Sequence, residues 1–150
     1  MAKENLVKIA FELLQDEDGY PHDRWETLWA EPVEQGELYR IDNIPFFAKG
    51  ISSEDVVKAE QRAGQLQYVR LVRASTNSVF RIYVADESTV LSARNSFREL
   101  GCESEQSHIP KLFALEIPGS IAIGPVAELM DEGAEGGLWE YEEGVLRHSP

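Results

Sequence analysis

The residues that could carry out chemistry are few in this 150-residue chain. Its histidines are His22, His108 and His148, and its one cysteine is Cys102. A nucleophilic site needs a histidine beside a serine or a cysteine. Cys102 and His108 lie on or near one predicted strand, and six positions along a strand separate them by roughly 20 Å. They form no dyad, so we expect a buried, apolar role for Cys102, a structural one for His108, no catalytic residue and no enzyme.

Metal and cofactor signatures are also lacking. The loop of residues 16–19 carries acids and a glycine, but it lacks the twelve-position pattern of calcium loops. Glu140 and Glu142 lie on one face of a predicted strand and could chelate a cation with Asp131 or Glu132. A single cysteine excludes a zinc site built on paired cysteines, and no glycine-rich phosphate-binding motif occurs. We therefore expect no metal and no cofactor.

The net charge is the largest departure from ordinary composition. Twenty-seven acids oppose 14 bases, which gives a formal net charge of −13. Residues 112–146, the base-free segment, contain no Lys or Arg. Nucleic acids and anionic membranes are excluded as partners, because phosphate binding needs clustered bases. A basic protein partner fits this charge, and the simpler alternative is that the acids only keep the chain dissolved. The predicted partner-binding residues are Glu128, Asp131, Glu132, Glu135, Glu140, Glu142 and Glu143.

Four aromatic residues form a second candidate site. Trp25, Trp29, Phe46 and Phe47 could line a ligand groove. The alternative is that they are wall residues of a small β lobe. Joint exposure of Phe46 and Phe47 would favour the groove, since contiguous exposed aromatic side chains mark interaction sites.

The first half of the sequence predicts short strands separated by turn signals. Val7, Ile9 and Phe11 alternate as on one face of a strand, and Trp25 and Trp29 share a face of the next. The polar turn of residues 75–78 predicts a hairpin between the strands on either side of it. The predicted strands cover residues 5–14, 24–31, 37–42, 53–60 and 65–74, with a helix as the alternative for 53–60.

The second half alternates between strand and helix periodicity. Val90, Ala93, Phe97 and Leu100 recur at helical spacing after Asp86, which can cap a helix. The predicted elements are strand 79–84, helix 87–100, strands 102–109 and 111–117, helix 125–134 and strand 138–142. This βαββαβ order is that of the ferredoxin-like arrangement.

The fold class that we predict is therefore α+β. An N-terminal small antiparallel β lobe, about residues 1–75, precedes a ferredoxin-like βαββαβ lobe, about residues 76–150. No linker or repeat separates the two lobes, so we expect a single domain over 1–150.

Four segments resemble a known family. They are Trp29-Ala-Glu-Pro32, residues 39–48 with their Asp-Asn-Ile-Pro-Phe-Phe run, Gly101-Cys-Glu-Ser104 and Trp139-Glu-Tyr-Glu-Glu143. Together they are similar to a bacterial family called domain of unknown function 4265, over about residues 11–143. The resemblance implies a bacterial protein that is not secreted, and it implies no activity.

The sequence also bears on location. No run reaches the roughly 18 apolar residues that span a bilayer, and residues 1–5 lack the apolar region of a signal peptide. With a single cysteine, these features favour the cytoplasm.

We therefore expect a non-catalytic, acidic protein-binding protein. More specifically, we predict an immunity or antitoxin protein, a toxin inhibitor that covers the active site of a basic cognate toxin such as a nuclease. The alternative is a small enzyme or small-molecule-binding module that uses the groove between the two lobes.

Overall fold

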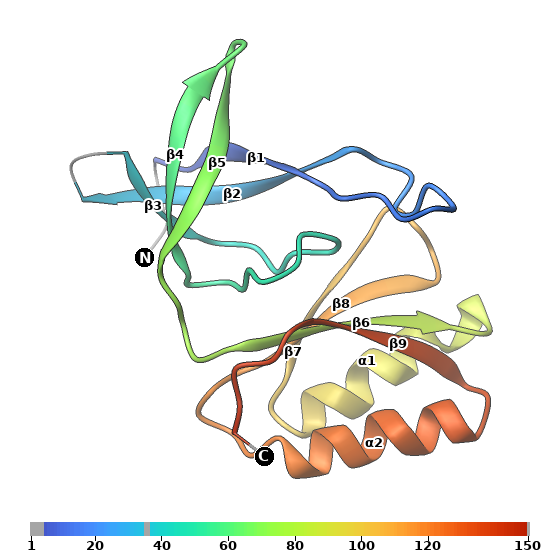
Figure 1. Cartoon of the computed structure of the whole chain (residues 1–150). Helices are drawn as coiled ribbons and strands as arrows, with labels where there is room; N and C mark the ends of the chain where they lie inside the picture. Colours follow the sequence, from blue (N-terminus) through green and yellow to red (C-terminus); the bar gives the residue numbers. More distant parts are fainter. Residues whose placement is uncertain (1–4, 35–36, 150) are drawn as a thin grey trace. The chain divides into compact units, whose positions relative to one another are not determined.

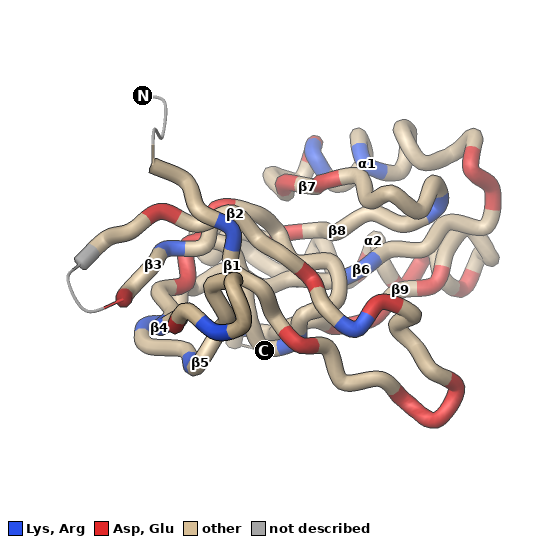
Figure 2. Tube along the Cα trace, turned by 90° about the horizontal axis from the view of Figure 1, so that it is seen from above, with Lys and Arg blue, Asp and Glu red and all other residues tan. Residues whose placement is uncertain are grey.

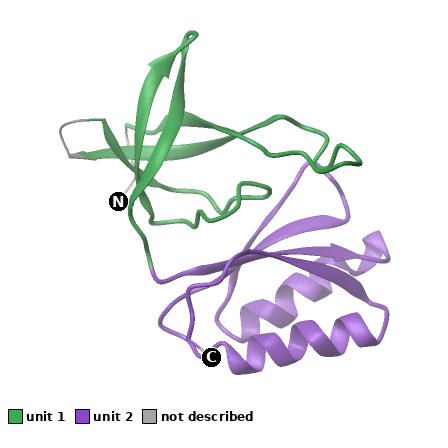
Figure 3. Ribbon diagram, viewed as in Figure 1, with its two compact units in different colours: residues 1–75 green, residues 76–150 purple. Residues whose placement is uncertain are grey.

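The computed structural model describes residues 5–34 and 37–149. Contacts between Cα atoms divide the chain into two units, residues 1–75 (unit 1) and residues 76–150 (unit 2), which Figure 3 shows in separate colours. Strands dominate, and two α-helices occur among the described residues. The predicted α+β class is therefore confirmed.

Unit 1 is a closed five-stranded barrel (Figure 1). Its successive strands pair antiparallel, but the barrel closes through a parallel pair between the first strand and the last. The prediction of an antiparallel lobe is therefore wrong for the pair of β1 and β5. The reason is geometric: in an odd-numbered series of alternating strands, the first and the last run in the same direction. The strands are β1 (Val7–Glu12), β2 (Trp25–Glu34), β3 (Leu38–Ile41), β4 (Val56–Arg62) and β5 (Gln65–Arg73).

The barrel interior is filled by alternate side chains of these strands. Ile9 and Phe11 of β1 pack against Leu28 and Ala30 of β2 in one buried cluster. The Phe11 ring stacks on Tyr68 of β5, with ring centroids 4.7 Å apart. Because successive strand residues point to opposite faces, this pattern leaves the side chains between them on the outside of the barrel.

The predicted hairpin at residues 75–78 is absent, since β5 and the next strand belong to different sheets. Side chains tie the two ends of this turn to different partners. Asp55 accepts a hydrogen bond from the Ser75 amide, and Asn77 accepts one from the Gly119 amide. The polar residues therefore form a connection between units rather than a tight turn.

Unit 2 is a four-stranded sheet in the order β7-β8-β6-β9, with every neighbouring pair antiparallel. Both helices lie on one face of this sheet, and their buried side chains form a single cluster with that face (Figure 1). The elements are β6 (Ser78–Val84), the 3₁₀ turn η1 (Glu87–Thr89), α1 (Val90–Glu99), β7 (Glu103–Gln106), β8 (Leu112–Ile117), α2 (Gly124–Glu135) and β9 (Trp139–Val145).

Helix α1 follows its sequence signals closely. Asp86 accepts a hydrogen bond from the Ser88 amide, which caps η1 and lowers the pKa of the Asp86 carboxyl group. Phe97 is fully buried, against Phe113 and Trp139. After α1, Gly101 takes the positive φ of +97° that reverses the chain.

Neither helix, nor any other helix among the described residues, is long and apolar enough to cross a membrane. The sequence predicts that residues 1–5 form no signal peptide. Residues 1–4 of this segment lie outside the described residues.

Candidate functional site

The predicted acidic residues of α2 gather on its outer face. Val126, Met130 and Gly133 are buried against the sheet, so the intervening positions point away from it. No base occurs in the last turn of α2. Figure 2 marks acidic positions in red and basic positions in blue along the described part of the trace. The exposed carboxylates of this outer face are Glu128, Asp131, Glu132 and Glu135.

The predicted acids of β9 do not share one face. Trp139 is buried on the helix side, so Glu140 and Glu142 point to the opposite face of the sheet. Glu143 lies opposite Phe80 and belongs to the helix side. The seven predicted residues therefore fall into two groups: Glu140 and Glu142 on one face, and Glu143 with the four α2 acids on the other side of the sheet.

Two of these seven acids have partners within unit 2. Glu142 pairs with Arg81 at 2.6 Å between Oε1 and Nη1, and the Arg81 side chain is only 4% exposed. Asp131 accepts a hydrogen bond from the Tyr141 hydroxyl, which raises the pKa of Tyr141. The remaining outward carboxylates are the better candidates for a partner, because a partner need not break an internal ion pair or hydrogen bond to reach them.

A shallow hollow of about 320 Å³ lies between α1 and α2. Glu99 of α1 faces it together with two of the α2 acids, and no base lines it. Glu99 is not among the partner-binding residues that the sequence predicts. Its position beside Leu100, away from the buried residues of the helix, is the feature of the sequence that could have predicted its exposure. The lining combines apolar and acidic side chains: Ser96, Glu99, Leu100, Pro125, Glu128, Leu129 and Glu132.

The four aromatic candidates do not line one groove. Trp25 and Trp29 project outward from β2 and are 41% and 42% exposed. Phe46 and Phe47 are half-buried in the loop after β3. Glu26 holds that loop, and its side chain leaves β2 on the face opposite Trp25. The two pairs therefore belong to different surfaces of unit 1, and Phe46 and Phe47 are not jointly exposed.

The Glu26 carboxylate organises the loop that carries the Asp-Asn-Ile-Pro-Phe-Phe run. Its oxygens accept hydrogen bonds from three consecutive amides, those of Phe46, Phe47 and Ala48, at 2.6, 3.0 and 2.8 Å. Asn43 of the same loop accepts a 2.6 Å hydrogen bond from the amide of a β2 residue, Trp29. This specific sequence segment therefore has a structural explanation: it is attached to β2 through side-chain acceptors.

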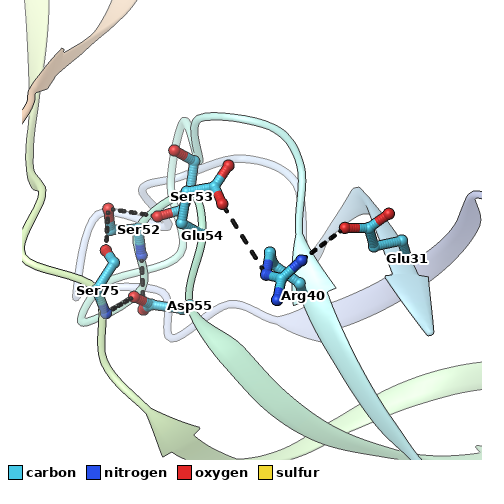
Figure 4. A network of polar contacts seen from close by, with 7 residues as sticks. All are labelled: Glu31, Arg40, Ser52, Ser53, Glu54, Asp55 and Ser75. Carbon is cyan, nitrogen blue, oxygen red and sulfur yellow. Dashed lines mark hydrogen bonds and ion pairs between the residues drawn. The ribbon is translucent and has the colours of Figure 1, made fainter. Parts of the chain in front are cut away.

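Figure 4 shows a second polar cluster in unit 1, in which Asp55 is buried and Arg40 is partly exposed. Asp55 is fully buried and accepts hydrogen bonds from the Ser52 amide at 2.9 Å and the Ser75 amide at 2.8 Å. Arg40 of β3 pairs with Glu31 of β2 at 2.8 Å. Because the Asp55 carboxylate is fully buried and bound by backbone amides, it presents no surface to a ligand, and it stabilises the loop before β4.

The structure brings one serine and one histidine together. Ser78 Oγ lies 2.6 Å from His148 Nδ1, and His148 Nε2 lies 3.0 Å from the Pro118 carbonyl oxygen. The carbonyl can only accept, so Nε2 donates to it and Nδ1 accepts from the Ser78 hydroxyl. Ser78 is fully buried and also accepts from the Arg147 amide at 2.8 Å. The pair anchors the segment after β9 and offers no accessible nucleophile.

Cys102 is buried, as the sequence predicts. Burial raises the pKa of its thiol to about 11, so the thiolate is scarce at neutral pH. His108 is exposed and lies beyond the end of β7. Within residues 5–34 and 37–149, no group of three or more His, Cys, Asp or Glu side chains could hold a metal ion.

Comparison with known proteins identifies the family. The model of a family described as "Domain of unknown function (DUF4265)" matches residues 26–141. The chain belongs to this family. The DUF4265 region starts at Glu26 and ends at Tyr141, so it includes the Glu26-bound loop and all of α2, whereas Glu142 and Glu143 follow it.

One solved structure is similar over its full length. It is described as a hypothetical protein from Neisseria gonorrhoeae, and the match has a TM-score of 0.79 at 20% sequence identity. It covers 99% of this DUF4265 chain and 100% of the other chain. At this identity the likeness shows the fold alone. No curated protein matches the chain.

Proposed function

We propose that this protein is non-catalytic and binds a basic protein partner through the acidic surface of unit 2. More specifically, we propose an immunity or antitoxin protein that covers the active site of a basic toxin, for example a nuclease. The observation that carries the proposal is the outer face of α2. It presents the exposed carboxylates of Glu128, Asp131, Glu132 and Glu135 in a segment of the chain without a single base.

Charge and shape support this proposal together. Oppositely charged surfaces speed the encounter of two proteins and disfavour wrong partners. The hollow between the helices adds apolar surface from Leu100, Pro125 and Leu129. A lysine or arginine side chain from a partner suits such a site, because its aliphatic part can cover apolar surface while its charged end meets carboxylates.

We also infer a ferredoxin-like fold for unit 2. The βαββαβ element order, the strand order β7-β8-β6-β9 and the placement of both helices on one face support this inference. The cytoplasmic location stays a prediction from the sequence.

The experiment that tests the function is affinity capture from the native bacterium, followed by binding kinetics. Three proteins serve as baits: the wild type, an α2 variant with Glu128, Glu132 and Glu135 all changed to Lys, and a control with Glu12, Glu17 and Asp18 changed to Lys. Both variants change the net charge equally, and all six side chains are exposed. The variants spare Asp131 and Asp16, because each accepts an internal hydrogen bond.

We expect a basic protein that the wild type and the control capture and the α2 variant does not. Its association rate should fall steeply as salt rises, because screening shortens the reach of the field to about 8 Å at physiological ionic strength. Its own activity should be inhibited by the wild type. Capture of the same proteins at equal rates by all three baits would contradict the proposal and favour a role of the acids in solubility alone.

A further inference from the structure

Strand β9 forms a free edge of the unit 2 sheet. Among the described residues it pairs only with β6, and it is seven residues long (Figure 1). An edge strand presents main-chain N–H and C=O groups that an added strand can use. Natural proteins protect such edges by short strands, by coverage or by charge. Strand β9 is not short, so its side chains decide which kind of strand could pair with this edge.

The register identifies which main-chain groups of β9 point outward. The Val84 amide donates to Lys111 on the β8 side of β6, so the neighbouring Tyr83 turns its main-chain groups toward β9. Tyr83 lies opposite Glu140. By alternation, Tyr141 and Glu143 turn their N–H and C=O groups to the free edge. No hydrogen bond among the described residues uses these groups.

The side chains along this edge are strongly acidic. Glu140 flanks it on one face of the sheet, beside Glu142 with its ion-pair partner Arg81, and Glu143 flanks it on the other. Asp131 of α2 reaches the same strand through the Tyr141 hydroxyl. A second copy of this chain would bring like charges together across the new strand pair, which is destabilising. A segment rich in Lys and Arg would instead place its charges beside these carboxylates.

We propose that the β9 edge binds an extended basic segment of the protein partner as an added strand of the sheet. This inference rests on the proposed function and specifies how the partner docks. Main-chain hydrogen bonds to Tyr141 and Glu143 hold the segment, and the acids on both faces select for bases at its successive positions. The two groups of acids that β9 separates then act on one ligand, because neighbouring side chains of an added strand also alternate between the faces.

The probe that tests this inference is a capped heptapeptide, Lys-Lys-Val-Lys-Lys-Val-Lys, which places Lys side chains on both faces of an added strand. The full-length protein is titrated with it, and amide hydrogen exchange is followed by NMR. We expect the exchange of the Tyr141 and Glu143 amides to slow at least tenfold at saturation. The effect should weaken with salt and be absent with a Glu and Val peptide of the same length. Peptide binding that leaves both amides unprotected would overturn the inference.

A pair of variants separates main-chain binding from charge. Glu143→Gln removes the carboxylate alone, whereas Glu143→Pro also removes the outward N–H. The proline variant should bind the basic peptide at least tenfold more weakly than the glutamine variant. Equal affinity of the two variants would overturn strand addition. If Glu143→Pro does not fold, the hydrogen-exchange result on the wild type decides.

Failure of this inference can be told apart from failure of the proposed function. A captured basic partner that requires the α2 acids but leaves the Tyr141 and Glu143 amides unprotected overturns strand addition alone. Absence of binding by the basic peptide and by every basic protein overturns both proposals.

Discussion

The two units solve the problem of exposed strand edges in opposite ways. Unit 1 closes five strands into a barrel, so each strand has a neighbour on both sides. Unit 2 leaves β7 and β9 as edges and covers one face of its sheet with helices. Closure satisfies main-chain groups internally, whereas an open sheet keeps some of them available to a partner. The comparison explains why the docking proposal concerns unit 2.

The units also differ in what their carboxylates do. In unit 1, Glu26, Asp55 and Asp16 accept hydrogen bonds from the backbone. In unit 2, Asp86 likewise caps η1, but most acids of α2 and β9 point outward, and Glu142 has an ion-pair partner in Arg81. The acidic residues of this chain therefore have two different roles. Some acids hold loops in place, and others form a charged surface.

The largest predicted effect concerns the apolar packing of unit 2. Replacing Phe97 by Ala should lower the free energy of unfolding by about 3–5 kcal/mol through lost burial and a cavity. Chemical denaturation measures it. The control is Leu91→Ala on the same helix, which is 68% exposed and should change stability by less than about 0.5 kcal/mol. Similar values for the two variants would mean that helix–sheet packing does not distinguish the faces of α1.

The next effect tests the internal use of carboxylates in unit 1. Glu26→Ala removes the acceptor of three consecutive amides and should cost about 3 kcal/mol, because hydrogen bonds to a charged acceptor are the strong ones. Glu26→Gln should cost less, since it keeps one oxygen. Glu12→Ala, at an exposed position of β1, is the control. Denaturation curves of Glu26→Ala and Glu12→Ala that coincide would remove the distinction between loop-holding and surface acids.

The third effect is a pH dependence located in the core of unit 2. The pKa of Cys102 is raised from 9.0 to about 11 in the folded state, so the unfolded chain loses this proton first as pH rises. Stability is therefore complete below pH 9 and falls by about 2 kcal/mol toward pH 11. Tyr68 and Tyr141, whose pKa values are also raised, act in the same direction.

Denaturation with urea at several pH values under reducing conditions checks this prediction. Cys102→Ala is the control and should show a shallower decline above pH 9. An unchanged slope in this variant would show that the thiol ionises as easily in the folded protein as in the unfolded chain.

The smallest effect tests whether the outward acids of unit 2 contribute to the stability of the fold. Glu140→Ala should change the free energy of unfolding by no more than roughly 0.5 kcal/mol, as exposed substitutions usually do. The measurement is chemical denaturation beside the wild type. A cost above about 1 kcal/mol would give this carboxylate a structural role and weaken the contrast with unit 1.

Local patterns predicted the elements well where burial and periodicity agree. The spacing of Val90, Ala93 and Phe97 predicts the buried face of α1, and the alternation around Ile9 and Phe11 predicts the inner face of β1. The prediction of a hairpin at residues 75–78 is wrong, because the same polar residues suit both a hairpin turn and a connection between two sheets. Turn composition reports the local backbone and carries no information on which strands pair.

The candidate sites were harder to predict than the elements. The sequence placed seven acids in one surface, but strand alternation in β9 and the position of α2 divide them between two sides of a sheet. Trp25 and Phe46 were grouped as one groove because both are aromatic, and the Glu26 hydrogen bonds assign them to different surfaces. The contact between Ser78 and His148 joins positions 70 residues apart and has no sequence signal at all.

The sequence by itself determined the α+β class, the membership in DUF4265, the strong acidity and the faces of individual helices and strands. These properties depend on residue type and on the spacing of residues within one element. The hydrophobic effect buries the apolar residues of an element, so their spacing sets which face is buried. Only the tertiary structure decided the parallel closure of the barrel, the loop held by Glu26 and the free edge at Tyr141 and Glu143. These depend on main-chain groups and long-range pairing, and every residue except proline offers the same backbone donor and acceptor wherever it stands in the chain.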